Sequence, residues 1–521
     1  MPRASPALSW LLLFCSTLVA APATLPSPSP FEQPLHVAPA GAIDRAVQDQ
    51  LKQLGIQPSG CCSDGVFVRR VFLDLIGTLP TAREVRSFLE SKDPQKRRLL
   101  IDQLLERPEF ADYWSMKWAD LLRVKAEFPI NLWPNAVQAY HKWIWQCVSD
   151  NLPYDQLARK LLTSSGSNFR VPPVNFYRAV QAKDPPSLAQ AVGLTLMGQR
   201  TWSKEQLEGM AGFFCRIGYK STLEWKEEIV FFDFTKPLPT AAIFPDGTPA
   251  KLTDDQDPRV VFADWLITPT NPWFTRNIAN RAWSWLVGRG VIHEPDDIRP
   301  DNPPSNPQLL AVLERLLIEN KYDLKQFFRL VLNSQTYQLS SVPHSKHKLA
   351  PAHFAFYPVR RMEAEVLIDA LCQITGTSER YTSPIPEPFT FIPEEQRTIA
   401  LADASISSSF LELFGRSPRD TGLELERNSR FSPSQRLHLL NSTHIQRKLT
   451  QGKKLQAVLD TKGGRRAVVT ELYLTILSRW PTDNELAAIE NHAETTEIRG
   501  REALIDVAWA LINSAEFLYR H

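Results

Sequence analysis

Two stretches of the chain share one pattern: RVFLDLIGTLPTAREV at residues 70–85 and ELYLTILSRWPTDNEL at residues 471–486. In each, an apolar run with helical spacing leads into a turn, and the sequence Pro-Thr-x-x-Glu follows. A Thr with a Glu three residues later is typical of a capping box, which begins a helix. Each stretch therefore predicts a helical hairpin, meaning two helices joined by a short turn.

Related phrases follow both hairpins. LLIDQLLERPEF ends at Phe110, ALIDVAWALINSAEF ends at Phe517, and a third helix at residues 324–337, LKQFFRLVLNSQTY, closes in a similar way. Such hairpins need neighbours to bury their apolar faces. Because the spacing is irregular, we expect a duplicated helical-hairpin module and not a regular solenoid.

The rest of the chain also predicts helices. Ile43, Val47 and Leu51 have helical spacing, and Gly55 is suited to end that helix. Apart from a β-element near residues 229–250, where a Pro-Asp-Gly turn follows an apolar run, little indicates strands. The predicted fold class is mainly α, irregular and multi-helical.

The composition is that of an ordinary globular protein. Of 521 residues, 43% are hydrophobic and 22% charged, which excludes a disordered or collagen-like chain. There are 59 Lys and Arg against 57 Asp and Glu, a net charge of +2. No global field therefore favours a nucleic acid partner or an anionic membrane.

The N-terminus predicts export. Arg3 precedes a short apolar run, and small residues then offer a cleavage site, so we expect a signal peptide at 1–23 and no stable membrane span afterwards. A retained N-terminal anchor is the alternative. A Pro/Ser-rich linker at 24–40, a helical domain at 41–235, a linker at 236–256 and a second helical domain at 257–521 follow. The expected location is secreted or periplasmic.

Five cysteines remain after the expected cleavage, an odd number that argues against a disulfide framework. The adjacent Cys61 and Cys62 leave two alternatives open, a strained bridge between them or two free thiols. No Cys-x-x-Cys or Cys-x-x-Cys-His run occurs, so neither a zinc site nor attached haem is expected.

Many short motifs resemble those of one known family. They are Arg69-Arg70-x-x-x-Asp74-Leu75-x-Gly77-x-x-Pro80-Thr81, Trp118-Ala119-Asp120-Leu121, Asn151-Leu152-Pro153-Tyr154-Asp155, Ala263-Asp264-Trp265-Leu266, Asn271-Pro272-Trp273-Phe274, Asn280-Arg281-Ala282-Trp283, Gly288-Arg289-Gly290, the run at 302–307, Tyr322-Asp323-Leu324-Lys325 and Leu437-His438-Leu439-Leu440-Asn441. The chain resembles, over nearly all of its mature length, the secreted bacterial family of paired domains of unknown function associated with planctomycete-type cytochrome c proteins. The resemblance implies a helical exported protein and carries no established activity.

The chain departs from that family at its cysteines. Members typically carry a Cys-x-x-Cys-His run where this chain passes from Arg200 to Trp202, and often a Cys-x-Cys-Glu-Arg phrase where it has residues 423–427. Both clusters are missing here. We expect a member without a cofactor or a metal, which puts a direct redox role in doubt.

Two carboxylate clusters are candidates for catalysis. Asp296 and Asp297 lie near Arg299, and neighbouring like charges can separate pKa values for acid and base roles. The alternative is a loop whose polar side chains order its own backbone.

The second cluster is placed on a predicted helix that runs through Arg360, Arg361, Glu363, Glu365 and Asp369. On such a helix Arg361 and Glu365 would share a face. The cluster would line a pocket for an anionic substrate, with Arg360 and Arg361 as binding residues, or form a solvated salt-bridged face, which we favour.

A group of histidines and the distribution of tryptophans are also considered as sites. His344, His347 and His353 have spacing that a metal could use, but two prolines mark the stretch as loop and no metal site is expected. Eleven of the 14 Trp lie between residues 114 and 285. Most are expected in the core, with one or two at the surface, and Trp273 and Trp283 are the candidates for binding.

These observations leave two functions open. The first is an exported helical scaffold, or binding partner, for an exported haem protein or hydrolase or for a surface polysaccharide. The second is an extracellular hydrolase that uses the carboxylates above, with polysaccharide as a candidate substrate.

Overall fold

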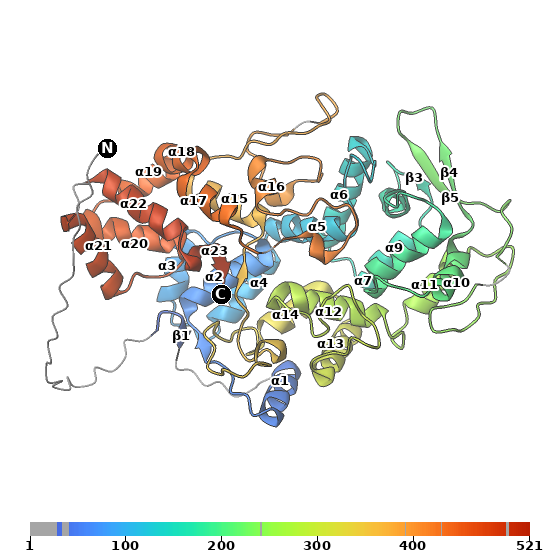
Figure 1. Cartoon of the computed structure of the whole chain (residues 1–521), viewed down its shortest axis with the longest axis horizontal. Coiled ribbons are helices and arrows are strands. Elements are labelled where there is room, and N and C mark those ends of the chain that lie inside the picture. The colour runs from blue at the N-terminus through green and yellow to red at the C-terminus, as the bar shows by residue number, and fades with distance from the viewer. Residues whose placement is uncertain (1–28, 34–40, 240–241, 391, 429, 496–499) are drawn as a thin grey trace, which may run out of the picture.

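The structure is a computed structural model that describes residues 29–33, 41–239, 242–390, 392–428, 430–495 and 500–521. Over these residues the chain is mainly α-helical with small sheets, which confirms the predicted fold class (Figure 1). The expected signal peptide lies outside the described residues. Within them, no helix is both long enough and apolar enough to cross a membrane.

The helices of the N-terminal half are α1 (Ala42–Gln53), α2 (Asp64–Ile76), α3 (Ala82–Glu90), α4 (Lys96–Leu105), α5 (Pro108–Leu121), α6 (Pro134–Ser149), α7 (Tyr154–Thr163), α8 (Asn175–Arg178), α9 (Pro185–Met197) and α10 (Lys204–Ala211). Those of the C-terminal half are α11 (Pro258–Leu266), α12 (Phe274–Val287), α13 (Pro307–Glu319), α14 (Leu324–Leu332), α15 (Ala364–Thr375), α16 (Ser409–Leu413), α17 (Pro433–Asn441), α18 (Thr443–Gln451), α19 (Lys453–Leu459), α20 (Gly464–Ile476), α21 (Asp483–Thr495), α22 (Arg501–Ile512) and α23 (Ala515–Leu518).

The strands form three small antiparallel sheets. β1 (Glu32–Gln33) pairs with β2 (Cys61–Cys62), and β6 (Arg360–Arg361) pairs with β7 (Tyr519–Arg520). The third sheet has the order β3 (Gly166–Ser167), β5 (Glu228–Phe232), β4 (Ile217–Ser221). β5 is the β-element expected near residue 229.

The two predicted hairpins are α2–α3 and α20–α21, and they agree in detail. Gly77 and Ser478 occupy equivalent places after the first helix, and both have left-handed backbone, with φ of 59° and 60°. Thr81 and Glu84 form the expected capping box before α3, and Thr482 and Glu485 make the same pair of backbone bonds before α21. The structure therefore supports a duplicated module.

The two copies also pack against one another. α3 contacts α20, while α4 lies on α2 as α22 lies on α20. Arg69 of α2, fully buried, reaches across and donates to the carbonyl oxygens of Ile476 and Phe517 at 2.8 and 2.7 Å. The first and last parts of the chain thus share one core, and they lie side by side in Figure 1 as blue and red ribbons.

One carboxylate joins these parts to the middle of the chain. Asp74 of α2 accepts hydrogen bonds from Arg360 and Arg520 on one oxygen, at 2.7 and 2.8 Å, and from the hydroxyls of Tyr337 and Tyr357 on the other, at 2.9 and 2.7 Å. The Asp74 side chain has no exposed surface. The small β6–β7 sheet carries both arginines to it.

Most tryptophans contribute to the core, as expected. Trp114, Trp118 and Trp285 are buried, and the ring of Trp285 lies 5.5 Å from that of Trp114 and 5.7 Å from that of Trp118. Within the segment at 236–256, expected to be a linker, a few described side chains reach the core. Its Phe244 is buried and stacks on Trp265 at 4.8 Å.

Gly77 gives a test of the hairpin geometry. A Cβ at this position would have left-handed backbone and would lie 2.4 Å from Cδ2 of Tyr113. Left-handed backbone alone costs a non-glycine residue about 1–2 kcal/mol, and the clash adds to it. We expect Gly77→Ala to lower the free energy of unfolding by about 3 kcal/mol in urea denaturation.

Gly55→Ala is the matched control, because its φ is similar, +65°, and a Cβ there would meet nothing within 4 Å. It should cost only about 1 kcal/mol. Equal losses in the two variants would show that the contact with Tyr113 does not constrain the turn.

Candidate binding surface

The carboxylates of the first cluster form internal ion pairs. Asp296 is buried, and its carboxylate binds Nη2 of Arg281 and the backbone N–H of Glu424, each at 2.6 Å. Asp297 binds Arg299 through two contacts of 2.7 and 3.0 Å. The two carboxylates thus have separate partners, and the arrangement matches an ordered loop more closely than an acid–base pair.

The second cluster does not lie on one helix. Arg360 and Arg361 form β6, Glu363 precedes α15 in extended conformation, and Glu365 lies in the first turn of α15. The predicted helix was wrong at its start because residues 360 and 361 pair with β7 instead. Arg361 and Glu365 therefore share no helical face.

This cluster is not solvated either, which corrects the interpretation that we favoured. Arg361, Glu365 and Asp369 are all buried. Asp369 accepts the backbone N–H groups of Thr398 and Ile399, at 2.8 and 3.1 Å. Local spacing showed charges at helical intervals but could not show the chain segments that cover them.

Glu363 and Glu365 stay ionised within this buried network. Glu363 binds Lys117 at 2.6 Å and also Arg520. Burial opposes its ionisation, but Arg520 and Lys117 outweigh it and hold the pKa of Glu363 well below its usual range. A carboxylate held in this way is a poor proton donor or acceptor near neutral pH.

Glu365 binds Arg427 through two contacts of 2.8 and 2.9 Å. Burial again opposes ionisation, and Arg427 together with Arg416 outweighs it, so that the pKa of Glu365 is lowered to about 2. Arg427 also binds Asp120 at 2.6 Å. The ion pairs around Glu365 thus link α5, α15 and the loop at 416–427.

The two tryptophan candidates are not open platforms. Trp283 has no exposed surface and packs edge-on against Phe354 at 5.2 Å, so a partner cannot reach it in this conformation. Trp273 is partly buried and donates to Oε1 of Gln199 at 3.2 Å.

Histidines and cysteines form no evident metal site. His344 pairs with Glu32 at 3.0 Å. Across the described residues, no group of three or more His, Cys, Asp or Glu side chains could hold a metal ion. Cys61 and Cys62 are buried thiols, and Nη1 of Arg97 lies 3.3 Å from Sγ of Cys61.

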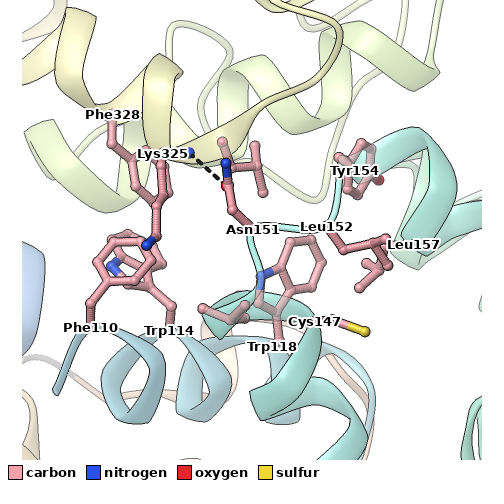
Figure 2. A pocket seen from close by; sticks show the side chains of 12 residues that line it. Phe110, Trp114, Trp118, Cys147, Asn151, Leu152, Tyr154, Leu157, Lys325 and Phe328 are labelled. Carbon is pink, nitrogen blue, oxygen red and sulfur yellow. Dashed lines mark hydrogen bonds between the residues drawn. The ribbon is translucent and has the colours of Figure 1, made fainter. Parts of the chain in front are cut away.

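None of the candidate residues lines either of two cavities found among the described residues. The first lies between α5, α6, α7 and α14, and Figure 2 shows the rings of Phe110, Trp114, Trp118 and Tyr154 around it. It encloses about 30 Å³. That space suits about two water molecules and is too small for a sugar or a cofactor.

The second cavity encloses about 180 Å³ beside α9. Arg123 and Asp420 are the charged residues in its lining, and Asp420 is held by Lys125 at 2.6 Å. No pair of carboxylates converges on it, so it offers no acid–base chemistry of the kind proposed from sequence.

An exposed aromatic cluster is the feature that sequence reasoning missed. Trp133, Trp225 and Phe389, here called the aromatic patch, come from three loops far apart in sequence. The ring of Trp225 lies 5.2 Å from those of both Trp133 and Phe389. Trp225 is 48% exposed and Phe389 52% exposed. Lys226 places its Nζ 4.2 Å from the centre of the Trp133 ring.

Further apolar side chains lie in the same loops. Phe128, five residues before Trp133, is 72% exposed, and Leu223, two residues before Trp225, is fully exposed. The sequence signal was Trp225 and Leu223 within the polar run STLEWKEE, where no helical or strand pattern explains apolar side chains.

The ion pairs of Glu365 generate a pH prediction. Since its folded pKa lies below its unfolded value, the stability it contributes is present above about pH 4.5 and is lost as the pH falls toward 2. Glu365→Gln should lower the free energy of unfolding by about 3 kcal/mol at pH 7. The difference in free energy of unfolding between the variant and the wild type should disappear as the pH falls from 5 to 2.

Glu319→Gln is the control, because Glu319 forms only an exposed ion pair with Arg315 and should change stability by less than about 0.5 kcal/mol. Urea denaturation at several pH values gives both measurements. Full stability of Glu365→Gln at pH 7 would contradict a structural role for this carboxylate.

Two family models match the chain. Residues 42–195 match PSCyt2, described as "Protein of unknown function (DUF1549)", and residues 258–493 match PSD1, described as "Protein of unknown function (DUF1553)". Neither a curated protein nor a solved structure matches. The two matches follow one another and span most of the chain, as the motif resemblance implied. The chain therefore belongs to this paired-domain family of unknown function.

Proposed function

We propose that this chain is an exported, non-catalytic binding protein that docks a partner protein through the aromatic patch. The observation that carries the proposal is the exposure of Trp225 and Phe389, in contact with one another at a place where three loops meet. Exposed contiguous apolar side chains of this kind mark interaction sites in soluble proteins.

The composition of the patch favours a protein partner over a sugar. Trp is the residue type most enriched among those that dominate binding energy at protein interfaces. A sugar ring stacks on an open aromatic face, but Lys226 lies over Trp133, and Trp225 has a neighbouring ring on either side. The exposed Phe128 and Leu223 add apolar area suited to a protein surface.

The buried carboxylates support the non-catalytic part of the proposal. Asp296, Glu363 and Glu365 are each bound by arginine or lysine, and Asp296 and Glu365 are also buried. The partner that we expect is an exported haem protein or hydrolase. That expectation comes from the family resemblance together with the missing cysteine clusters.

The test compares the tagged chain with two patch variants, Trp225→Ala and Phe389→Ala, in capture from its own exported fraction with quantitative mass spectrometry. We expect one protein to be retained in stoichiometric amount by the wild type and lost by both variants. With that protein purified, each variant should weaken the dissociation constant about 30-fold, the size of a strong interface contact of about 2 kcal/mol.

Trp480→Ala is the matched control, since Trp480 is 39% exposed and lies in the turn between α20 and α21. It should retain the partner fully. Equal capture by all four proteins would refute the patch as a docking site, and hydrolysis of a polysaccharide by wild type and patch variants alike would favour the enzyme reading.

A further inference from the structure

The positive charge of the chain is concentrated in one segment. Residues 427–466 contain ten Lys and Arg against a single acidic residue, Asp460, which gives this segment a net charge of +9 while the whole chain carries only +2. The remainder of the chain is therefore acidic overall, and the segment stands apart from it.

Most of these cations are exposed and unpaired. Lys448 and Arg427 are the exceptions, since Lys448 is buried beside Glu379 and Arg427 is partly buried and pairs with Glu365. The other eight are exposed, and within the described ranges only Arg466 among them has a carboxylate within 4 Å, Asp483 at 3.4 Å. The eight, here called the basic face, are Arg430, Arg436, Arg447, Lys453, Lys454, Lys462, Arg465 and Arg466.

The basic face lies on neighbouring helices. α17 contacts α18 and α18 contacts α19, and Figure 1 shows the three helices together. Their apolar residues, such as Leu439, Leu449 and Leu455, are buried. Arg436, Arg447 and the Lys453–Lys454 pair remain on the outer sides of these helices, while the last of the cations lie where α20 begins.

At the start of α20, Arg466 pairs with Asp483 at 3.4 Å, but Arg465 has no carboxylate partner among the described residues. The N-cap of α20 is Gly463, which makes no side-chain cap, and its first turn contains Arg465 and no acidic residue. The helix dipole disfavours a cation there. α4 also begins with cations, but there Lys96 and Arg97 bind Asp64 at 2.7 and 2.8 Å. An anion from outside would supply at α20 what Asp64 supplies at α4.

The arrangement of the cations on the basic face indicates which class of anionic ligand fits it. The cations extend over three helices and into a fourth, and none of them lines either cavity described above, which favours an extended anion over a small enclosed ligand. A lipid surface would need apolar side chains to insert, and the exposed large ones are confined to Leu437 and Leu440 of α17. Single-stranded nucleic acid would need exposed rings for stacking, and the segment has no exposed large aromatic side chain among its described residues.

We infer that the basic face binds an acidic polysaccharide, a carboxylated or sulfated polymer laid across α17–α19 and the start of α20. This surface is separate from the aromatic patch, so the inference stands whether or not the patch docks a protein. Together the two surfaces would let the chain hold a partner protein at an anionic polymer.

The test measures binding of the full mature chain to dextran sulfate and to polygalacturonate, with neutral dextran as the uncharged probe. We expect binding to both acidic polymers, none to neutral dextran, and an affinity that falls steeply as salt rises, since released counterions oppose binding. A fourfold charge reversal, Lys453→Glu, Lys454→Glu, Lys462→Glu and Arg465→Glu, should weaken binding at least tenfold.

The matched control reverses four exposed cations elsewhere that have no ion pair among the described residues: Lys92→Glu, Lys220→Glu, Lys251→Glu and Lys346→Glu. It changes the net charge equally and should alter the affinity less than twofold. The reversal at Arg465 places an acid where the α20 dipole favours it, so the melting temperature should not fall. If the fourfold charge-reversal variant does not fold, a variant with Gln at the same four positions is measured instead.

Three results would overturn the inference. An equal loss of affinity in the two charge-reversal variants would show that binding depends on net charge alone. Tighter binding to phosphatidylglycerol vesicles or to single-stranded DNA than to either acidic polysaccharide would assign the face to another partner. Equal binding of neutral dextran would remove the role of charge.

Discussion

The fold depends on the burial of one carboxylate. Asp74 has no contact with solvent, and each of its two oxygens accepts two hydrogen bonds, one oxygen from Arg360 and Arg520 and the other from Tyr337 and Tyr357. An isolated ionised carboxylate in such a place would cost several kcal/mol, so its partners must all be present for the core to close. Because they come from separate parts of the chain, this single requirement draws α2, β6, β7 and the segment after α14 to one point.

Local sequence signals predicted well where helices begin, but they did not predict which distant segments pack against them. The capping box at Thr81 and Glu84, and the turn equivalent to it before α21, follow from residues three apart, so the sequence contains all that is needed to recognise them. Arg360 and Arg361 follow a different rule. Their extended conformation depends on pairing with residues 519 and 520, about 160 positions away, and no periodicity within 360–369 contains that information. Helical spacing was therefore extended too far toward the N-terminus of α15.

The candidate site shows the same division. Asp296, Glu363 and Glu365 were recognised as unusual carboxylates, but whether they face a substrate or an arginine is decided by distant residues such as Arg281, Arg520 and Arg427. The polar run around Trp225 was a local signal, but the contacts of Trp225 with Trp133 and Phe389 depend on distant segments. The whole-chain charge of +2 concealed a local excess of +9, because an acidic remainder cancels it. A sum over the chain is a weak guide to surfaces when the charge is so unevenly placed.

The distance in sequence between Asp74 and Arg520 also determines how long after Asp74 its partner Arg520 is synthesised. The two residues are 446 positions apart, and ribosomes add about 5–20 residues per second, so Asp74 waits roughly 20–90 seconds for its last partner to be made. During that interval Asp74 lacks the two arginine partners that it has in the finished fold. A chain built in this way completes the core around Asp74 only after the segment that contains Arg520 has been made.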